Sequence, residues 1–315
     1  GIVVIGQTEG SSADVTFKGS ASAVSFDMGV ASGSSVGTNG LTFNATGGNT
    51  TVTGTIQGID TEDLNTVTFN GGVSGTARVI TLATDMGANI DTLAIGDYTT
   101  LLAGGSNDAL TATAISLGSS AVIKTGAATM VITGTVDGSV AGNGTLDLDH
   151  HTNVVGSIGG TTGIGAIDIA DAVVLTTNSA AVKATTITFG NASSELNTIT
   201  TATTITGNLV AGADGAGDLD VDIGTTIVGN VGSSTVLDLA TANVADTIGL
   251  TVSGNYYVAA TVLNGVASSL TFNGTEAQTV SGTINAHTAL DGDVYVGTDA
   301  GVASNVTFSS ALGGG

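Results

Sequence analysis

Four aspartates lie close together in one polar stretch of the chain, and their spacing suits the binding of a hard cation. Asp218, Asp220 and Asp222 alternate with aliphatic residues, and Asp214 precedes them in a glycine-rich segment. Alternate residues of a strand point to the same side, so these carboxylates would project from one face. Ca²⁺ takes oxygen ligands of this kind. The sequence therefore predicts that Asp214, Asp218, Asp220 and Asp222 hold Ca²⁺ loosely, and no organic cofactor is expected.

A solvated acidic face is the alternative interpretation of this run. Calcium-binding nonapeptide repeats carry a Gly-x-Gly-x-Asp frame, but Leu219 stands where that frame requires an aspartate. The run also occurs once, whereas repeat sites are built from several stacked copies.

A second group of potential ligands is the segment Asp147, Leu148, Asp149, His150, His151. Carboxylates and imidazoles together could bind a transition metal. Adjacent residues on a strand point to opposite faces, so the two imidazoles would not easily reach one ion. A turn at the end of a strand explains this segment better than a metal site.

The sequence carries no arrangement of residues typical of an active site. None of the three histidines, His150, His151 and His287, is flanked by a nucleophile motif. Enzymes that cleave polysaccharides combine clustered carboxylates with aromatic or cationic platforms for the sugar. Here Trp is absent, Tyr occurs four times, and Lys and Arg together occur four times. We therefore expect a protein that is not an enzyme.

The charge of the chain limits its partners. Asp and Glu number 26 against four Lys and Arg, which gives a formal net charge of -22. Such a chain repels nucleic acid and anionic membrane surfaces, so neither is expected as a partner. Cys is absent, which excludes disulfides and thiolate metal sites. No run of 18 apolar residues occurs, so no membrane-spanning segment is expected.

Short strands that recur along the chain are expected to position these residues. Segments such as 15–17, 146–148 and 237–239 alternate apolar and polar residues, which is typical of a strand with one buried face. Two longer segments, 41–56 and 270–284, are near copies: each opens on Leu-Thr-Phe-Asn and closes on Val-x-Gly-Thr-Ile. Self-similarity at a period of about 20 to 50 residues indicates a stacked repeat architecture.

Phenylalanine and glycine mark the repeats. Six of the seven Phe occupy the opening strand: Phe17, Phe43, Phe69, Phe189, Phe272 and Phe308. The first three are spaced 26 residues apart. The closing strands contain a recurrent glycine: Gly54, Gly134, Gly156, Gly207, Gly229 and Gly282. Glycine permits the positive φ that a corner between two faces of a coil requires.

These features predict an all-β fold, a parallel β-helix (β-solenoid) with irregular loops. Rungs of roughly 20 to 26 residues would give about 12 to 15 rungs. In this coil Phe43 and Phe272 should point inward, and Thr42 and Thr271 outward. An antiparallel β-sandwich pair is the alternative. Unequal loops favour the solenoid, as does the absence of Pro, which leaves every backbone N–H free to join a ladder.

We expect residues 1–315 to form a single elongated β-solenoid. The chain opens on Gly and shows no signal peptide. The sequence is therefore expected to be part of a longer processed precursor.

The combination of Thr-Phe-Asn-Gly openings, Val-x-Gly-Thr/Asn-Ile closings, few aromatics and few cations resembles the passenger regions of bacterial autotransporters. It is most similar to rickettsial surface antigens of the outer-membrane-protein A and B kind. The likeness is clearest over residues 41–72, 114–136, 187–231 and 270–308. It implies an extracellular protein of the bacterial cell surface that acts in adhesion or in formation of a surface layer.

Two functions remain open. The first is a structural protein that assembles with copies of itself into a surface layer or filament. The second is an adhesin whose loops bind a receptor on a host or neighbouring cell. Terminal rungs of a solenoid expose unpaired backbone groups and the apolar interior of the coil. Self-association is therefore expected through the apolar residues at the two ends: Ile2, Val3, Val4, Ile5, Val306 and Phe308.

Overall fold

The structure is a computed structural model that describes residues 1–6, 12–29, 38–59, 64–104, 109–126, 129–234, 238–288, 292–297 and 305–310. Its regular elements are all β-strands, and no helix that could cross a membrane occurs in this part of the chain. The strands are β1 (Ile2–Ile5), β2 (Ala13–Lys18), β3 (Ala21–Met28), β4 (Thr38–Asn44), β5 (Thr50–Gly58), β6 (Leu64–Asn70), β7 (Arg78–Leu82), β8 (Thr92–Ile95), β9 (Thr99–Gly104), β10 (Ala109–Leu117), β11 (Val122–Gly126), β12 (Met130–Gly138), β13 (Asn143–Leu148), β14 (Thr152–Val155), β15 (Ile164–Ile169), β16 (Val174–Asn178), β17 (Ala181–Phe189), β18 (Glu195–Thr198), β19 (Thr203–Ala211), β20 (Asp218–Val221), β21 (Thr225–Val228), β22 (Leu239–Val244), β23 (Gly249–Val252), β24 (Tyr256–Leu263), β25 (Ser269–Phe272), β26 (Gln278–Ala286), β27 (Asp293–Val296) and β28 (Val306–Phe308).

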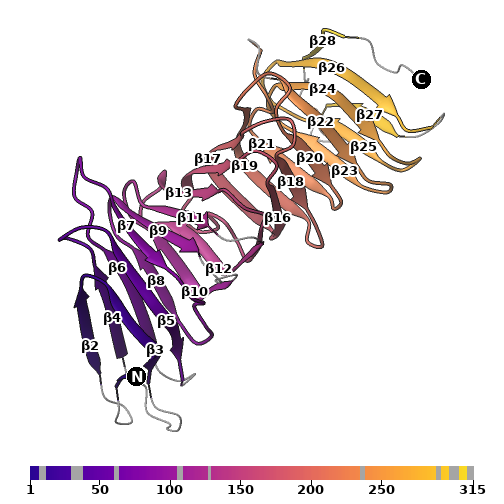
Figure 1. Cartoon of the computed structure of the whole chain (residues 1–315). Helices are drawn as coiled ribbons and strands as arrows, with labels where there is room; N and C mark the ends of the chain where they lie inside the picture. The colour runs from indigo at the N-terminus through magenta and orange to yellow at the C-terminus, as the bar shows by residue number, and fades with distance from the viewer. Residues whose placement is uncertain are drawn as a thin grey trace. The chain divides into compact units, whose positions relative to one another are not determined.

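The chain forms a parallel β-solenoid of about 12 turns, which confirms the predicted fold class. It divides into an N-terminal unit, Gly1–Gly165, and a C-terminal unit, Ala166–Gly315. In the N-terminal unit the strands stack in the orders β1-β3-β5-β7-β9-β11-β13 and β2-β4-β6-β8-β10-β12-β14. In the C-terminal unit the orders are β17-β19-β21-β23-β25-β27 and β16-β18-β20-β22-β24-β26-β28. Figure 1 shows these stacked strands within each unit.

Inward side chains form columns in the N-terminal unit, because each strand pairs in register with the strand one turn later. Three of these columns are Phe17, Phe43, Phe69, Ile95, Leu117; then Ala21, Val52, Leu82, Ala103, Thr125, Leu148; then Phe26, Ile56, Met86, Leu110, Ile132, Val154. Most of these residues are completely buried. The core is therefore a set of thin stacked layers, as the shortage of large side chains requires.

The C-terminal unit repeats this arrangement. Its columns include Leu175, Leu196, Leu219, Ala242, Thr261, Ile284; then Val182, Ile205, Ile227, Val252, Phe272; then Ile187, Leu209, Val231, Tyr256, Val280, Phe308. Tyr256 is the largest of the buried side chains, and its hydroxyl lies 2.7 Å from the Thr261 hydroxyl. That hydrogen bond satisfies a polar group which would otherwise be costly to bury.

The predicted orientation of the opening strands is confirmed. Phe43 and Phe272 have no exposed surface, while Thr42 and Thr271 are partly exposed. The Phe17, Phe43 and Phe69 rings stack along one column with centroids 5.6 and 5.4 Å apart. The regular spacing of these phenylalanines in the sequence therefore reflects one residue per turn in one column.

The recurrent glycines form corners, as predicted. Gly54, Gly134, Gly207 and Gly282 all have positive φ, and strand pairing shifts register at or beside each of them. At Gly207 φ is 138°, and a Cβ atom there would lie 1.8 Å from the Ala184 carbonyl oxygen. Only glycine allows the backbones of successive turns to approach this closely.

We predict that Gly207→Ala destabilises the fold by at least about 2 kcal/mol, since the variant combines an unfavourable φ with a backbone collision. Denaturant unfolding followed by circular dichroism would measure the change. Gly224→Ala is the matched control, because its Cβ would meet nothing within 4 Å. That variant should stay within about 0.5 kcal/mol of the parent. Equal losses in both variants would contradict the corner argument.

Candidate functional site

β1 and β2 belong to the first turn of the described chain. Among the described residues each pairs with one strand, β3 and β4 respectively, and each stands first in its stacking order. Ile2 is 61% exposed and Val4 39% exposed, whereas Val3 is partly buried and Ile5 is buried. β1 is therefore an apolar strand with two side chains pointing inward and two outward, and its predicted role in self-association stays a prediction.

β27 and β28 belong to the last turn of the described chain, and they pair with β25 and β26. Val306 and Phe308 point inward, in register with Gln278 and Val280 of the preceding turn. Gln278 and Val280 are each 2% exposed, whereas Val306 and Phe308 are partly exposed. The same contrast holds at the other end between partly exposed Phe17 and fully buried Phe43. In the described part of the chain, the inward surface of each end rung is thus only partly covered.

The acidic run lies on the outer surface of the C-terminal unit. Asp218 and Asp220 face outward from β20, Asp222 follows the strand, and Asp214 lies in the preceding turn. Thr241 of the next turn donates a hydrogen bond of 2.6 Å to Asp218 Oδ1. Among the described residues, no three His, Asp or Glu side chains are arranged to hold a metal ion. Binding of Ca²⁺ by this run stays a prediction.

Two carboxyl groups in this region have raised pKa values. Partial burial raises the pKa of Asp220, and the charges of Asp222 and Asp218 raise it further. Partial burial also raises the pKa of Asp238, with a contribution from Asp214. Sequence analysis missed Asp238, which lies one turn beyond Asp214. The length of one turn could have revealed Asp238, because residues separated by one turn lie side by side in a solenoid.

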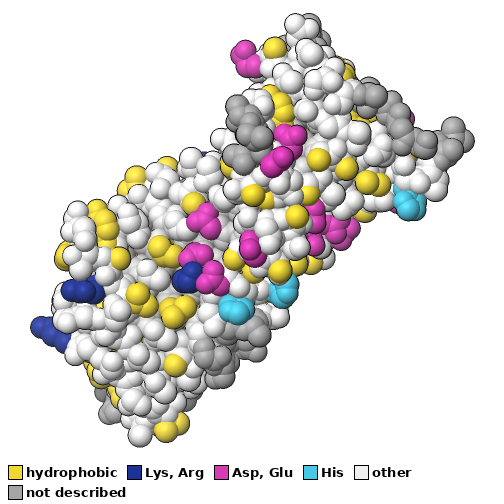
Figure 2. Space-filling model, turned by 45° about the horizontal axis from the view of Figure 1, so that its top comes forward, with side chains coloured by type: hydrophobic (Ala, Val, Ile, Leu, Met, Phe, Trp, Pro, Cys, Tyr) yellow, Lys and Arg dark blue, Asp and Glu magenta, His cyan; other side chains and the backbone are white. Residues whose placement is uncertain are grey.

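The segment considered for a transition metal instead contains a salt-bridge cluster. Lys124 Nζ on β11 lies 2.6 Å from Asp147 Oδ2 and 2.7 Å from Asp149 Oδ2. Partial burial lowers the pKa of Lys124, but hydrogen bonds and charge attraction from the two aspartates outweigh it and raise the pKa overall. Figure 2 shows acidic side chains in several separate groups on the visible face, one of them surrounding a basic side chain.

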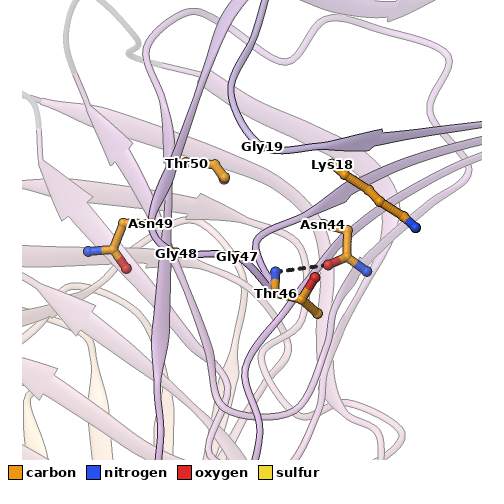
Figure 3. Close-up of a pocket in the computed structure, with 8 residues that line it drawn as sticks. All are labelled: Lys18, Gly19, Asn44, Thr46, Gly47, Gly48, Asn49 and Thr50. Carbon is orange, nitrogen blue, oxygen red and sulfur yellow. Dashed lines mark hydrogen bonds between the residues drawn. The ribbon is translucent and has the colours of Figure 1, made fainter.

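A cleft of about 400 Å³ lies at the β4–β5 turn. It is lined by Lys18, Gly19, Asn44, Thr46, Gly47, Gly48, Asn49 and Thr50. The Thr46 amide donates a hydrogen bond of 2.9 Å to Asn44 Oδ1. Figure 3 shows the Lys18 side chain extending away from Gly47 and Gly48, and Asn49 pointing away from Lys18. These side chains do not converge on a common point, so the cleft offers no arrangement for acid–base or nucleophilic chemistry.

Comparison with protein-family models, with curated proteins and with solved structures finds no match to this chain. The two ends of the solenoid and the acidic outer surface are therefore interpreted from their own geometry.

We predict that Asp220→Asn stabilises the protein at neutral pH. A carboxyl whose pKa is higher in the folded than in the unfolded state binds protons preferentially when folded. Its charge is therefore destabilising above that pKa, and the penalty disappears as the pH falls through it. Because Asp220 remains in contact with solvent, the gain should be about 0.5 kcal/mol. Thermal unfolding at neutral and acid pH would measure it.

The stabilisation should shrink as the pH falls below the raised pKa of Asp220 and vanish below the ordinary pKa that an aspartate has in the unfolded chain. Asp14→Asn, which removes an exposed carboxylate from β2, serves as the control and should have a smaller effect. A gain that is the same at both pH values would contradict this account.

We also predict that Ca²⁺ raises the melting temperature, since a divalent cation would relieve repulsion among the carboxylates of the acidic run. The measurement is a thermal scan with Ca²⁺ and with chelator. The double variant Asp218→Asn/Asp220→Asn should lose the Ca²⁺ effect. Identical melting curves for the parent chain under the two conditions would refute the prediction.

Proposed function

We propose that the chain is an extracellular, non-catalytic structural protein of the bacterial cell surface that assembles with copies of itself into a filament or surface layer. The observation that carries this proposal is that, among the described residues, the strands of the first and last turns each pair on one side only. Inward apolar residues such as Phe17 and Phe308 are partly exposed in these turns. Edge strands of this kind pair readily with another chain.

The location at the cell surface is supported by the autotransporter-like sequence pattern. Repeated aliphatic-Thr-Phe strands, corner glycines and a strongly acidic composition resemble passenger regions, including those of the rickettsial surface antigens. The parallel β-solenoid is the fold that such a resemblance implies. A charge of -22 keeps the chain soluble and disfavours contact with anionic polymers.

An adhesin is the second candidate function, and exposed apolar side chains on turns favour it. Val73, Val140 and Val266 are 58%, 64% and 68% exposed and lie between strands rather than at the ends. Single exposed valines are common on protein surfaces, so they support this candidate less strongly than the open ends support assembly. Saturable binding of the monomer to cells would select the adhesin.

Deletion of residues 1–6 tests assembly. The full chain should form particles that grow with concentration in light scattering, and the truncated chain should remain small because β1 is missing. A circular dichroism melt shows whether the truncated chain is folded. Val228→Thr is the control: it removes a 46% exposed aliphatic side chain from β21, inside the stack, and should leave particle size unchanged. Equal assembly of the full and truncated chains, or a full chain that stays monomeric at high concentration with Ca²⁺, would contradict the proposal.

A further inference from the structure

The sequence contains several Asn-x-Ser/Thr triplets, each of which matches the acceptor motif for an N-linked sugar in an exported protein. Their asparagines are Asn44, Asn49, Asn143, Asn191, Asn273 and Asn305. Such triplets also arise by chance in a chain rich in Asn and Thr, so the motif alone does not separate acceptors from bystanders. The structure separates them, because the triplets differ in how the asparagine side chain and the backbone N–H of the Ser or Thr are bonded.

Two of the triplets form the same local turn. The Thr46 N–H donates a hydrogen bond of 2.9 Å to Asn44 Oδ1, and the Ser193 N–H donates one of 2.8 Å to Asn191 Oδ1. Asn44 is the last residue of β4, and Asn191 follows β17 by two residues. Both strands have a paired strand on each side, so the two turns lie within the stack.

The hydrogen bond to Oδ1 affects the reactivity of the side-chain amide. An amide nitrogen is a weak nucleophile, because its lone pair is delocalised onto the carbonyl oxygen. When Nδ2 loses a proton to a base, negative charge accumulates on Oδ1, and an N–H donor fixed at that oxygen stabilises the charge. Within the described part of the chain, Nδ2 of Asn44 and of Asn191 donates no hydrogen bond, so it is available for reaction. Figure 3 shows the Asn44 oxygen directed at the Thr46 amide and the nitrogen directed away from it.

Both triplets can be reached from solvent. Thr46 and Ser193 are exposed, and Asn44 and Asn191 are partly exposed. Asn44 and Thr46 also line the cleft of about 400 Å³ at the β4–β5 turn, which leaves space beside the acceptor nitrogen. The cleft has no catalytic arrangement of its own, which suits a side chain that another enzyme modifies.

Contacts with neighbouring turns prevent the same hydrogen bond in the triplet at Asn49. The Thr51 N–H donates instead to Ser20 Oγ at 3.1 Å. Asn49 Oδ1 accepts a hydrogen bond of 3.0 Å from the Val79 N–H. The oxygen and its local donor are thus both bonded to other turns, although Asn49 itself is exposed.

The triplet at Asn143 is also bonded elsewhere, because it runs into β13. The Thr145 N–H donates a hydrogen bond of 2.9 Å to the Ala121 carbonyl oxygen. Asn143 Nδ2, the atom that would react, donates one of 3.2 Å to Ser139 Oγ. Of the remaining triplets, Asn273 has a buried Oδ1 with no partner among the described residues, and the Thr of the Asn305 triplet lies in β28.

We propose that Asn44 and Asn191 are acceptors for N-linked glycosylation, and that Asn49 and Asn143 are not. Glycosylation at these sites requires the proposed location outside the cell, but it does not require self-assembly. The donor is a sugar that carries a phosphate or diphosphate group on its anomeric carbon. The bond from Nδ2 to that carbon forms as the bond from the carbon to the phosphate oxygen breaks. The phosphate group leaves with the electron pair, and the Nδ2 proton passes to a base of the transferase.

Peptide mapping of the protein from the cells that produce it tests this assignment. A protease that cleaves at aspartate is used, because the chain has 26 Asp and Glu but only four Lys and Arg. Fragmentation of the peptides in a mass spectrometer should locate an added sugar on Asn44 and Asn191, and none on Asn49 or Asn143. Thr46→Ala removes the hydroxyl that defines the triplet and should abolish the sugar on Asn44 but not on Asn191. Thr46→Ser keeps a hydroxyl and should retain both sugars.

Three results would contradict the proposal. Sugar on Asn49 and Asn143 as well would mean that the chain is modified before neighbouring turns engage these triplets, and would overturn the selection by the turns. Unmodified Asn44 and Asn191 in protein that external protease removes from intact cells would overturn the glycosylation sites and leave the proposed function standing. Unmodified protein that stays protected inside intact cells would overturn both the sites and the proposed location.

Discussion

The fold depends on one constraint: each turn must hydrogen-bond in parallel register with the turns on either side of it. A shift by a single residue would turn an inward column outward and expose its aliphatic side chains. The absence of Pro leaves every residue able to donate to this ladder. Because the core is only one coil wide, the columns are filled by small and medium side chains, with Phe used where three turns of equal length allow rings to stack. Corner glycines then let the backbones of successive turns approach closely.

The solenoid could be predicted from the sequence because the period of the turns is visible in the spacing of large inward residues. Phe17, Phe43 and Phe69 recur at equal spacing, and each lies at the same point of its turn. The column then continues through Ile95 and Leu117, which no sequence motif distinguishes from other aliphatic residues. The later phenylalanines belong to different columns: Phe272 follows Val252, and Phe308 follows Val280. A recurring motif therefore predicts an inward strand, but it does not specify the face of the coil, since turn length and corner position change along the chain.

Contacts between side chains of successive turns could not be predicted from the sequence, because turn length and corner position change along the chain. Lys124 meets Asp147 and Asp149 only because β11 and β13 are neighbours in the ladder. Asp214 lies close enough to Asp238 to contribute to the raised pKa of Asp238, although 24 residues separate the two in the sequence. The closing Gly-Asn pairs show the same effect. Asn208 Oδ1 accepts a hydrogen bond of 3.0 Å from the Asn230 amide, and Asn230 Oδ1 accepts one of 2.8 Å from the Asn255 amide. Asn208 and Asn230 each follow a recurrent glycine in the sequence. That they form a ladder of hydrogen bonds from turn to turn depends on the register of the strands, which the sequence does not show.

In the proposed assembly, the distribution of charge favours contacts through strand edges over contacts between the acidic outer surfaces. Repulsion between copies with a net charge of -22 is long-ranged at low salt and falls off within about 8 Å at physiological ionic strength. Pairing of edge strands acts at much shorter distance, through backbone groups and buried aliphatic side chains. β1 and β28 contain no ionisable side chain, while β2 carries both Asp14 and Lys18. An outer surface such as that of β20, with Asp218 and Asp220, would instead bring carboxylates together. Under the proposed function, salt or divalent cations would thus lower the electrostatic barrier to the approach of two copies, and strand edges would be the places where the copies meet.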